Sequence, residues 1–243
     1  MLTYRGVMST LPMFPLGSVL FPAMPLPLRV FEERYLAMLA HVLQDEPPEF
    51  GVVLIERGQE VGGGDVRFDV GTIAQISDLE VTENMVGLVG LGGQRFQVDS
   101  WGSDDPFPQA EVSLLDDLVW DEAHRDLLDE AERTVRAGMA VASEYVELAW
   151  SPAVELADSP ADAAWQLAAI APLGPMDQVE LLRATSMPHL LSRLIELTAS
   201  SLDSIRFSWT DLHDDDEETP DCEELLVVQH YAFDDTPSEE ELA

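Results

Sequence analysis

Residues 11–35 read LPMFPLGSVLFPAMPLPLRVFEERY, an almost entirely apolar stretch that five prolines interrupt before it turns into Phe-Glu-Glu-Arg-Tyr. Proline lacks the N–H donor and its ring clashes with the preceding helical turn, so this stretch cannot form one continuous helix. The residue before a proline favours extended backbone. The spacing therefore predicts extended pieces at Leu11–Leu16, Ser18–Phe21 and Met24–Leu28, which we expect to be buried strands joined by irregular crossings.

The same stretch does not fit a targeting signal. Arg5 is the only cation before it, and the prolines break the helical core that a secretory signal needs. The chain has no later run of about 18 apolar residues, as a membrane-spanning helix would require. A lone cysteine, Cys222, argues against an intrachain disulfide framework and fits a reducing compartment. We expect a cytoplasmic protein with no membrane partner.

The charge of the chain limits its chemistry. The 243 residues carry 47 acidic and 12 basic side chains, a formal net charge of -35, and all 12 cations are arginine. Such a charge repels phosphate backbones and argues against nucleic-acid binding. Without lysine there is no P-loop, no Ser-Lys dyad and no lysine Schiff base. With 46% apolar residues, the chain can still bury a core as one large domain or two small ones.

The first half of the chain has the pattern of β structure. Phe31–Leu43 has apolar residues at spacings of three and four and predicts a short helix. Strands are predicted at Phe50–Ile55, Val70–Leu79, Met85–Leu91, Gln94–Trp101 and Ala110–Leu115. The glycines between Gly87 and Gly93 predict a hairpin turn, because their spacing does not fit a dinucleotide-binding loop. Several strands with short turns favour a compact barrel or sandwich.

The second half has the period of helices. An apolar stripe runs from Leu127 through Trp150, and Ser159-Pro160 is typical of a helix start. Further helices are predicted at Met176–Thr185 and after Ser186, which would cap the last one. Four helices packed as a bundle against the strands are the natural interpretation.

The two ends of the chain differ from its middle. Residues 211–243 hold 14 acidic residues and no cation, which predicts a solvated, mostly disordered acidic tail. Within it, Leu225–Val228 is strand-like and is a candidate to fold back onto a sheet edge. Its acidic neighbours would then meet nearby arginines, with candidates Arg29, Arg57, Arg67 and Arg95. At the other end, Met1–Val7 has no pattern of its own and is expected to be disordered or dispensable.

No constellation of catalytic or metal-ligating residues is visible. Nothing assembles a nucleophile, a base and oxyanion donors, so we expect no catalytic residue and no cofactor. His213, Cys222 and His230 match no known zinc spacing, so no metal is expected either. Glu32, Glu33 and Arg34 are interpreted as an ion-paired anchor of the short helix rather than as acid–base residues.

Several motifs in order carry a family resemblance. They are Pro15-Leu16, Val19-Leu20-Phe21-Pro22, Leu26-Pro27-Leu28-Arg29-Val30-Phe31-Glu32-Glu33-Arg34-Tyr35, Phe50–Ile55, Val70-Gly71-Thr72-Ile73-Ala74 and Gly93-Gln94-Arg95-Phe96. Together they resemble the Lon protease N-terminal (substrate-binding) domain family. The resemblance implies an α+β fold with a PUA-like β-barrel at 9–117 and a helical bundle at 118–210, followed by the acidic tail at 211–243. In that fold the proline-rich run would be the first strand and crossing, held by Phe31, Arg34 and Tyr35.

The resemblance also implies a function. It points to a stand-alone, non-catalytic polypeptide-binding module that lacks the ATPase and protease domains, and the missing lysine argues independently that neither domain is hidden here. Its partners would be unfolded or tagged polypeptides, or a protease or chaperone that it serves as an adaptor or quality-control factor. The candidate peptide-binding residues are Met13, Phe14, Phe21, Met24 and Leu26. The favoured alternative is that these five are simply core. A small-ligand or uncharacterised enzymatic role in the cleft between barrel and bundle is the other functional hypothesis, and RNA binding is weakened by the charge.

Overall fold

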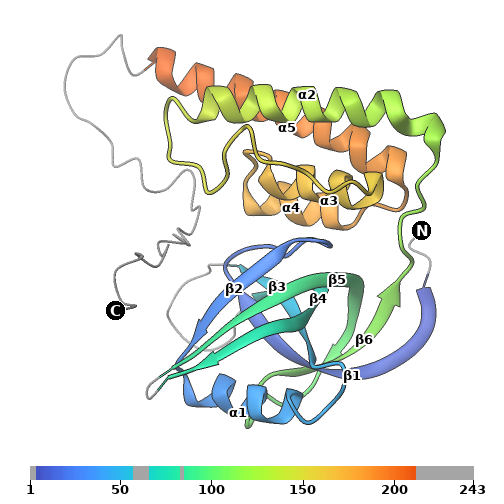
Figure 1. The fold of residues 1–243 in the computed structure, drawn as a ribbon, viewed down its shortest axis with the longest axis vertical. Coiled ribbons are helices and arrows are strands. Elements are labelled where there is room, and N and C mark those ends of the chain that lie inside the picture. Colours follow the sequence, from blue (N-terminus) through green and yellow to red (C-terminus); the bar gives the residue numbers. More distant parts are fainter. Residues whose placement is uncertain (1–3, 57–65, 83–84, 212–243) are drawn as a thin grey trace, which may run out of the picture.

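The computed structural model describes residues 4–56, 66–82 and 85–211, and within them strands precede most of the helices (Figure 1). The strands are β1 (Tyr4–Leu16), β2 (Pro25–Val30), β3 (Glu49–Glu56), β4 (Val66–Val81), β5 (Val86–Trp101) and β6 (Gln109–Leu115). The helices are α1 (Glu33–Val42), the short 3-10 helix η1 (Glu122–His124), α2 (Arg125–Ala142), α3 (Pro160–Ile170), α4 (Pro175–Leu182) and α5 (Met187–Asp211).

The six described strands form one sheet in the order β2-β5-β4-β3-β1-β6. β1 and β3 run parallel and the other pairs are antiparallel. β6 also pairs with β5, so the ladder through β1, β3, β4, β5 and β6 closes on itself. β2 lies outside this ring, paired with the first half of β5. A mixed α+β fold with a compact sheet, as the sequence predicts, is confirmed at this level.

The proline-rich stretch forms two strands and one irregular crossing. Leu11–Leu16 ends β1 and Met24–Leu28 overlaps β2, but the strand predicted at Ser18–Phe21 is absent and that segment is irregular. Its backbone is held by long-range hydrogen bonds: the Ala23 N–H donates to the Gly92 carbonyl over 2.8 Å, and the Thr72 hydroxyl donates to the Leu20 carbonyl over 2.7 Å.

The hairpin turn predicted at Gly87–Gly93 is wrong. These glycines lie inside β5, which runs unbroken from Val86 to Trp101. Gly92 is needed for a close approach, because a Cβ at this position would lie 2.1 Å from the Phe21 carbonyl oxygen. The glycine thus allows the crossing segment to lie directly on the strand, where the Gly92 N–H donates to the Met24 carbonyl.

Two predicted boundaries also need correction. Residues 4–7 are not a disordered start, because β1 begins at Tyr4, opposite Leu115 of β6. The helix predicted to reach Trp150 ends at Ala142 instead. After it the chain folds back along α2, where the Arg136 guanidinium donates hydrogen bonds to the carbonyls of Pro152 and Val154. Several predicted features lie outside the described residues: Arg57, His213, Cys222, His230, Leu225–Val228 and nearly all of the acidic tail.

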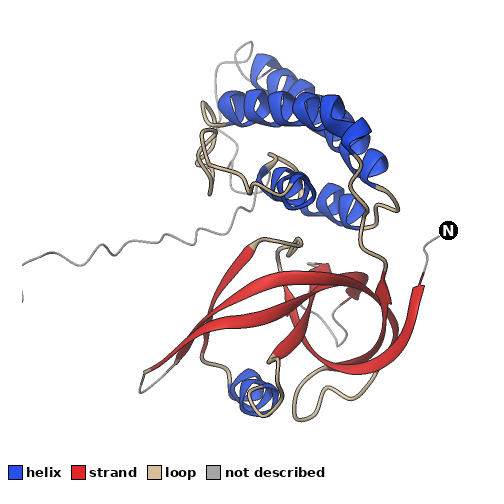
Figure 2. Ribbon diagram, turned by 45° about the vertical axis from the view of Figure 1, so that its right-hand side comes forward, coloured by secondary structure: helices blue, strands red, loops and turns tan. Residues whose placement is uncertain are grey.

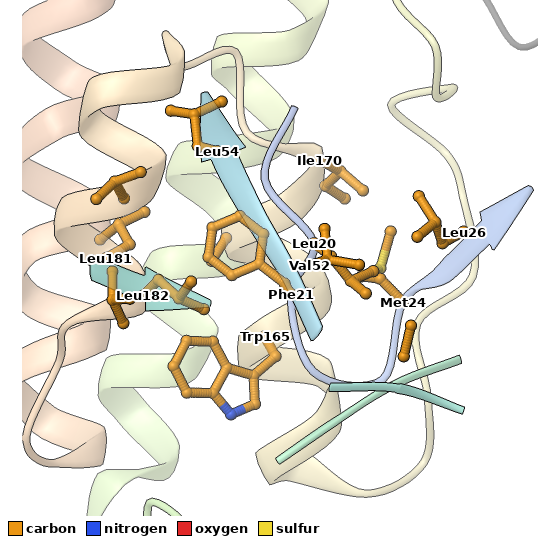
Figure 3. Packing of buried hydrophobic residues seen from close by; sticks show 14 of the residues in the cluster. Leu20, Phe21, Met24, Leu26, Val52, Leu54, Trp165, Ile170, Leu181 and Leu182 are labelled. Atoms are coloured by element: carbon orange, nitrogen blue, oxygen red, sulfur yellow. The ribbon is translucent and has the colours of Figure 1, made fainter. Parts of the chain in front are cut away.

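The helices form a layered cover on one side of the sheet. α2 packs along α5, and α3 and α4 lie between that pair and the strands (Figures 1 and 2). α1 lies on the opposite side, where Tyr35 stacks on Phe14 of β1 with ring centres 4.1 Å apart. A continuous apolar core runs from the sheet into α3 and α4, with Phe21 facing Trp165 (Figure 3).

Candidate functional site

Arg95 joins the sheet to the helices. It lies in β5 and is only 4% exposed. Its Nη1 donates to the carbonyls of Leu182 and Ala184, each over 2.7 Å, and its Nη2 donates to the Asp116 carbonyl over 2.9 Å. The guanidinium also lies over the Trp165 ring, 4.8 Å from its centre. One side chain therefore connects β5 to α3, to the end of α4 and to the segment that follows β6.

Burial makes the positive charge of the Arg95 guanidinium energetically unfavourable. Burial lowers the pKa of Arg95 to about 10, while the nearby Asp117 carboxylate acts in the opposite direction. The guanidinium remains protonated near neutral pH, so its three bonds to carbonyls are charge-assisted and stronger than neutral ones. Arg95 is a structural joint whose donors face inward.

An open pocket of about 470 Å³ lies beside this joint. Its walls come from the interior of β5, from the end of β6, from the segment between β6 and α2, and from the turn that leads into α5. The lining residues are Arg95, Leu115, Asp116, Asp117, Leu118, Val119, His124, Ala184, Thr185, Ser186, Met187 and Pro188. The volume falls within the roughly 300–1,000 Å³ that is usual for ligand pockets.

The lining is apolar inside and acidic at its rim. Leu118 and Met187 are buried, whereas Val119 is 82% exposed, the highest value among the large exposed apolar side chains of the described residues. The side chains of Asp116 and Asp117 are exposed. A surface with an exposed apolar residue near carboxylates can bind an apolar group and a cation together.

The polar groups of the pocket serve local structure. The Ser186 hydroxyl accepts a hydrogen bond from the His189 N–H over 3.3 Å and so caps α5, as the sequence predicts. The Nδ1 atom of His124 is buried without a hydrogen-bond partner among the described residues. Its ring packs edge-on against Trp120 at 6.1 Å. Within the described part of the chain, no hydrogen bond joins His124 to a hydroxyl of this pocket.

The five residues predicted to bind peptides lie in the core. Met13 is fully buried among Val53, Phe96, Ala110 and Val112. Phe14, Phe21, Met24 and Leu26 are 8%, 1%, 8% and 7% exposed and belong to the larger core cluster. Figure 3 labels the last three of them. Their burial agrees with the core alternative, and a peptide-contact role for them stays a prediction that would require the fold to open.

Of the other predicted contacts, some are formed and others are not. Glu32 and Arg34 form the expected exposed ion pair at 3.0 Å, and Tyr35 holds the first strand by stacking on Phe14. Phe31 is 69% exposed and does not belong to the buried core, so the expected holding role is not seen for it. Arg67, a candidate partner of the acidic tail, forms a bidentate pair with Asp104. The sequence hypothesis of a cleft between barrel and bundle named none of the residues that line this pocket, since Val119 and Ser186 are neighbours only through the fold.

Two kinds of feature are absent from the described residues. No three of their histidine, cysteine and acidic side chains gather where they could hold a metal ion. Among the helices in this part of the chain, none combines the length and apolar character needed to cross a bilayer.

The family of the chain follows from comparison with known proteins. Residues 10–200 match the family described as the ATP-dependent protease La (LON) substrate-binding domain. The match covers the sheet and most of the helical layer, and the chain therefore belongs to this family, as its opening motifs indicate.

Sequence relatives support the same conclusion. The chain is 30% identical over 123 residues to the Lon protease of Cytophaga hutchinsonii, a match covering 49% of this chain and 15% of that protein. It is 30% identical over 132 residues to the Lon protease of Anaeromyxobacter dehalogenans, covering 53% of this chain and 15% of that protein. The chain thus spans only about 15% of the length of these curated relatives.

Solved structures share the fold. A Lon N-terminal domain protein from Xanthomonas campestris superposes with a TM-score of 0.55 and 28% identity, covering 79% of this chain and 98% of that one. The N-terminal domain of the Mycobacterium avium complex Lon protease has the same TM-score and coverage at 15% identity, and supports the fold alone.

Proposed function

We propose that this chain is a non-catalytic substrate-recognition module that binds unfolded or tagged polypeptide segments, as an adaptor or a quality-control factor for a protease or chaperone. The observation that carries the proposal is the match to a substrate-binding domain family over residues 10–200. The lysine-free composition adds support, because it removes the P-loop and Ser-Lys chemistry of an ATP-dependent protease from these 243 residues.

The fold supports this proposal in two respects. The closed ladder of β1, β3, β4, β5 and β6 is compatible with the PUA-like β-barrel of the family. The junction between this ring and the helices provides an open pocket with an exposed apolar side chain, and exposed apolar surface is typical of sites for polypeptides.

The proposal is tested with an array of overlapping peptides from an unrelated globular protein, probed with the purified full chain. We expect binding to peptides from the apolar interior of that protein and little binding to peptides from its surface. The same peptides on an array probed with a folded protein of equal charge serve as the control. An array without any bound peptide above that control would refute the proposal.

Binding of a small ligand is the second candidate, and the volume of the pocket is the observation that favours it. A thermal-shift screen of metabolites separates the two candidates. A ligand that raises the melting temperature by several degrees, and fails to do so in a Val119→Glu variant, would favour the small-ligand function. We expect no such ligand, because the mouth of the pocket is open and Val119 faces solvent.

A further inference from the structure

Among the residues that the structure describes, no exposed cation neutralises the acidic rim of the pocket. Asp116 and Asp117 are exposed, and among the described residues neither forms an ion pair. The lining contains one cation, Arg95, and its guanidinium is buried and bonded to three carbonyls. Asp121 and Glu122 follow closely in sequence, and the one arginine beside them, Arg125, already pairs with Glu122 at 3.1 Å.

The same excess of carboxylates over unpaired arginines extends over the described surface. Six arginines are in ion pairs with carboxylates: Arg34, Arg67, Arg125, Arg136, Arg183 and Arg193. Of the nine arginines whose side chains the structure describes, only Arg29 and Arg133 are exposed without such a pair. Residues 1–210 have 33 acids against 12 arginines, a formal charge of -21. The surface therefore attracts cationic chains and repels anionic ones.

We propose that the pocket between β6, η1 and the start of α5 binds apolar polypeptide segments that carry lysine or arginine. An apolar side chain of the segment packs on Val119 and Leu118, and the neighbouring ammonium or guanidinium donates to the carboxylates of Asp116 and Asp117. This inference rests on the proposed function and assigns it a site and a chemical class of substrate. It also separates the site from the five buried residues that the sequence suggests.

The acidic tail of this chain could also occupy the pocket, but its charge is of the wrong sign. Residues 211–243 contain the strand-like Leu225–Val228, but they carry 14 acids and no cation. Such a segment would meet Asp116 and Asp117 with like charge, which is unfavourable. A basic client does not meet this repulsion.

The test is a fluorescence-anisotropy titration of the full chain with three short peptides. The peptides share one apolar core and differ only in two flanking residues, which are lysine, glutamine or glutamate. We expect the lysine peptide to bind about tenfold more tightly than the glutamate peptide at low salt, with the glutamine peptide between them. The difference should shrink when salt is raised from about 0.05 to about 0.5 M, because the charges are exposed.

Matched variants test whether the preference for the lysine peptide arises at the pocket. Asp116→Asn/Asp117→Asn keeps the backbone carbonyl that Arg95 binds, and should lower the affinity for the lysine peptide about fivefold while leaving the glutamine peptide unchanged. Val119→Ser should weaken all three peptides by a similar factor. Glu33→Gln/Asp45→Asn makes the same change in net charge on α1 and just after it, on the far side of the sheet, and should leave the preference intact (Figure 1).

The outcomes separate this inference from the proposed function. Equal affinity for the three peptides would overturn the inference and leave the proposed function standing, and so would equal effects of the two charge-removing pairs. Failure of all three peptides to bind, together with an empty peptide array, would refute both. Failure of the three peptides with a positive array would overturn the inference alone.

Discussion

The guanidinium of Arg95 in β5 lies 4.8 Å from the centre of the Trp165 ring in α3. This contact and the three hydrogen bonds of Arg95 to carbonyls fasten the helical layer to the sheet. The pocket opens beside the joint, between Asp116 and Ala184, whose carbonyls both accept from Arg95. The shape of the candidate site therefore depends on a lining residue whose guanidinium is bonded to backbone carbonyls.

Replacing Arg95 should lower the free energy of unfolding. Arg95→Met leaves three carbonyls without their donor, and a buried acceptor left unpaired costs about 1–3 kcal/mol. Because the variant also removes a buried charge, we expect a net loss of about 2–4 kcal/mol in the free energy of unfolding, measured by urea denaturation. Arg29→Met is the matched control, and since Arg29 is exposed it should change stability by less than about 0.5 kcal/mol. Equal losses in the two variants would contradict the assignment of Arg95 as a joint.

Two adjacent glycines of β5 should differ in how much an added Cβ destabilises the fold. A Cβ on Gly92 would lie 2.1 Å from the Phe21 carbonyl oxygen, whereas a Cβ on Gly93 would first meet the Ile73 carbonyl at 3.6 Å. Gly92→Ala should therefore lower the free energy of unfolding by about 1–3 kcal/mol or more, because the backbone of the crossing must move. Gly93→Ala should change it by less than about 1 kcal/mol. Chemical denaturation of both variants measures this, and a Gly92→Ala protein as stable as Gly93→Ala would show that the crossing does not press on β5.

The features that sequence predicted well have local causes. Proline chemistry placed the end of β1 and the approximate start of β2, and capping placed the start of α3, where the Ser159 side chain accepts from the Asp162 N–H at 3.4 Å. A helix start or a proline break depends on residues a few positions away, which a sequence displays directly.

The features that sequence missed depend on distant residues. The glycines of β5 resemble a turn until Phe21, some 70 residues earlier, is found lying on Gly92. Likewise the apolar residues of the opening stretch look surplus until Trp165 and the core of α3 cover them. The pocket joins the segment around Val119 to the turn at Ser186, and no local pattern indicates that these two will meet.

Two surface ion pairs predict a loss of stability in acid. The hydrogen bond from Arg67 lowers the pKa of Asp104, and the hydrogen bond from Arg193 lowers the pKa of Glu180. The unfolded chain then binds more protons than the folded one. The stabilisation is therefore complete above the unfolded pKa values and is lost as pH falls through the lowered ones. Both carboxylates are more than a third exposed, so each pair contributes at most about 1 kcal/mol.

The variant Asp104→Asn/Glu180→Gln measures this contribution. Thermal unfolding followed by circular dichroism should give a lower melting temperature than the unaltered chain near neutral pH. The difference should vanish at about pH 2–3, where the carboxylates of the unaltered chain are protonated as well. A difference that stays constant down to that pH would show that the two pairs have no part in acid stability.

Substitutions in the core and in the pocket should have opposite effects on stability and on peptide affinity. Phe21 is 1% exposed and faces Trp165, so Phe21→Ala should cost about 3–5 kcal/mol of unfolding free energy, and the milder Phe21→Leu should keep the chain folded for binding measurements. We expect Phe21→Leu to bind the lysine-flanked peptide with unchanged affinity.

Val119→Ser should do the reverse, since Val119 is 82% exposed: its free energy of unfolding should stay within about 0.5 kcal/mol while its peptide affinity falls. Denaturation and anisotropy on the same two preparations give both quantities. If Phe21→Leu weakened binding at unchanged stability, Phe21 would be a peptide contact, as the sequence suggests, and the fold would have to open to expose it.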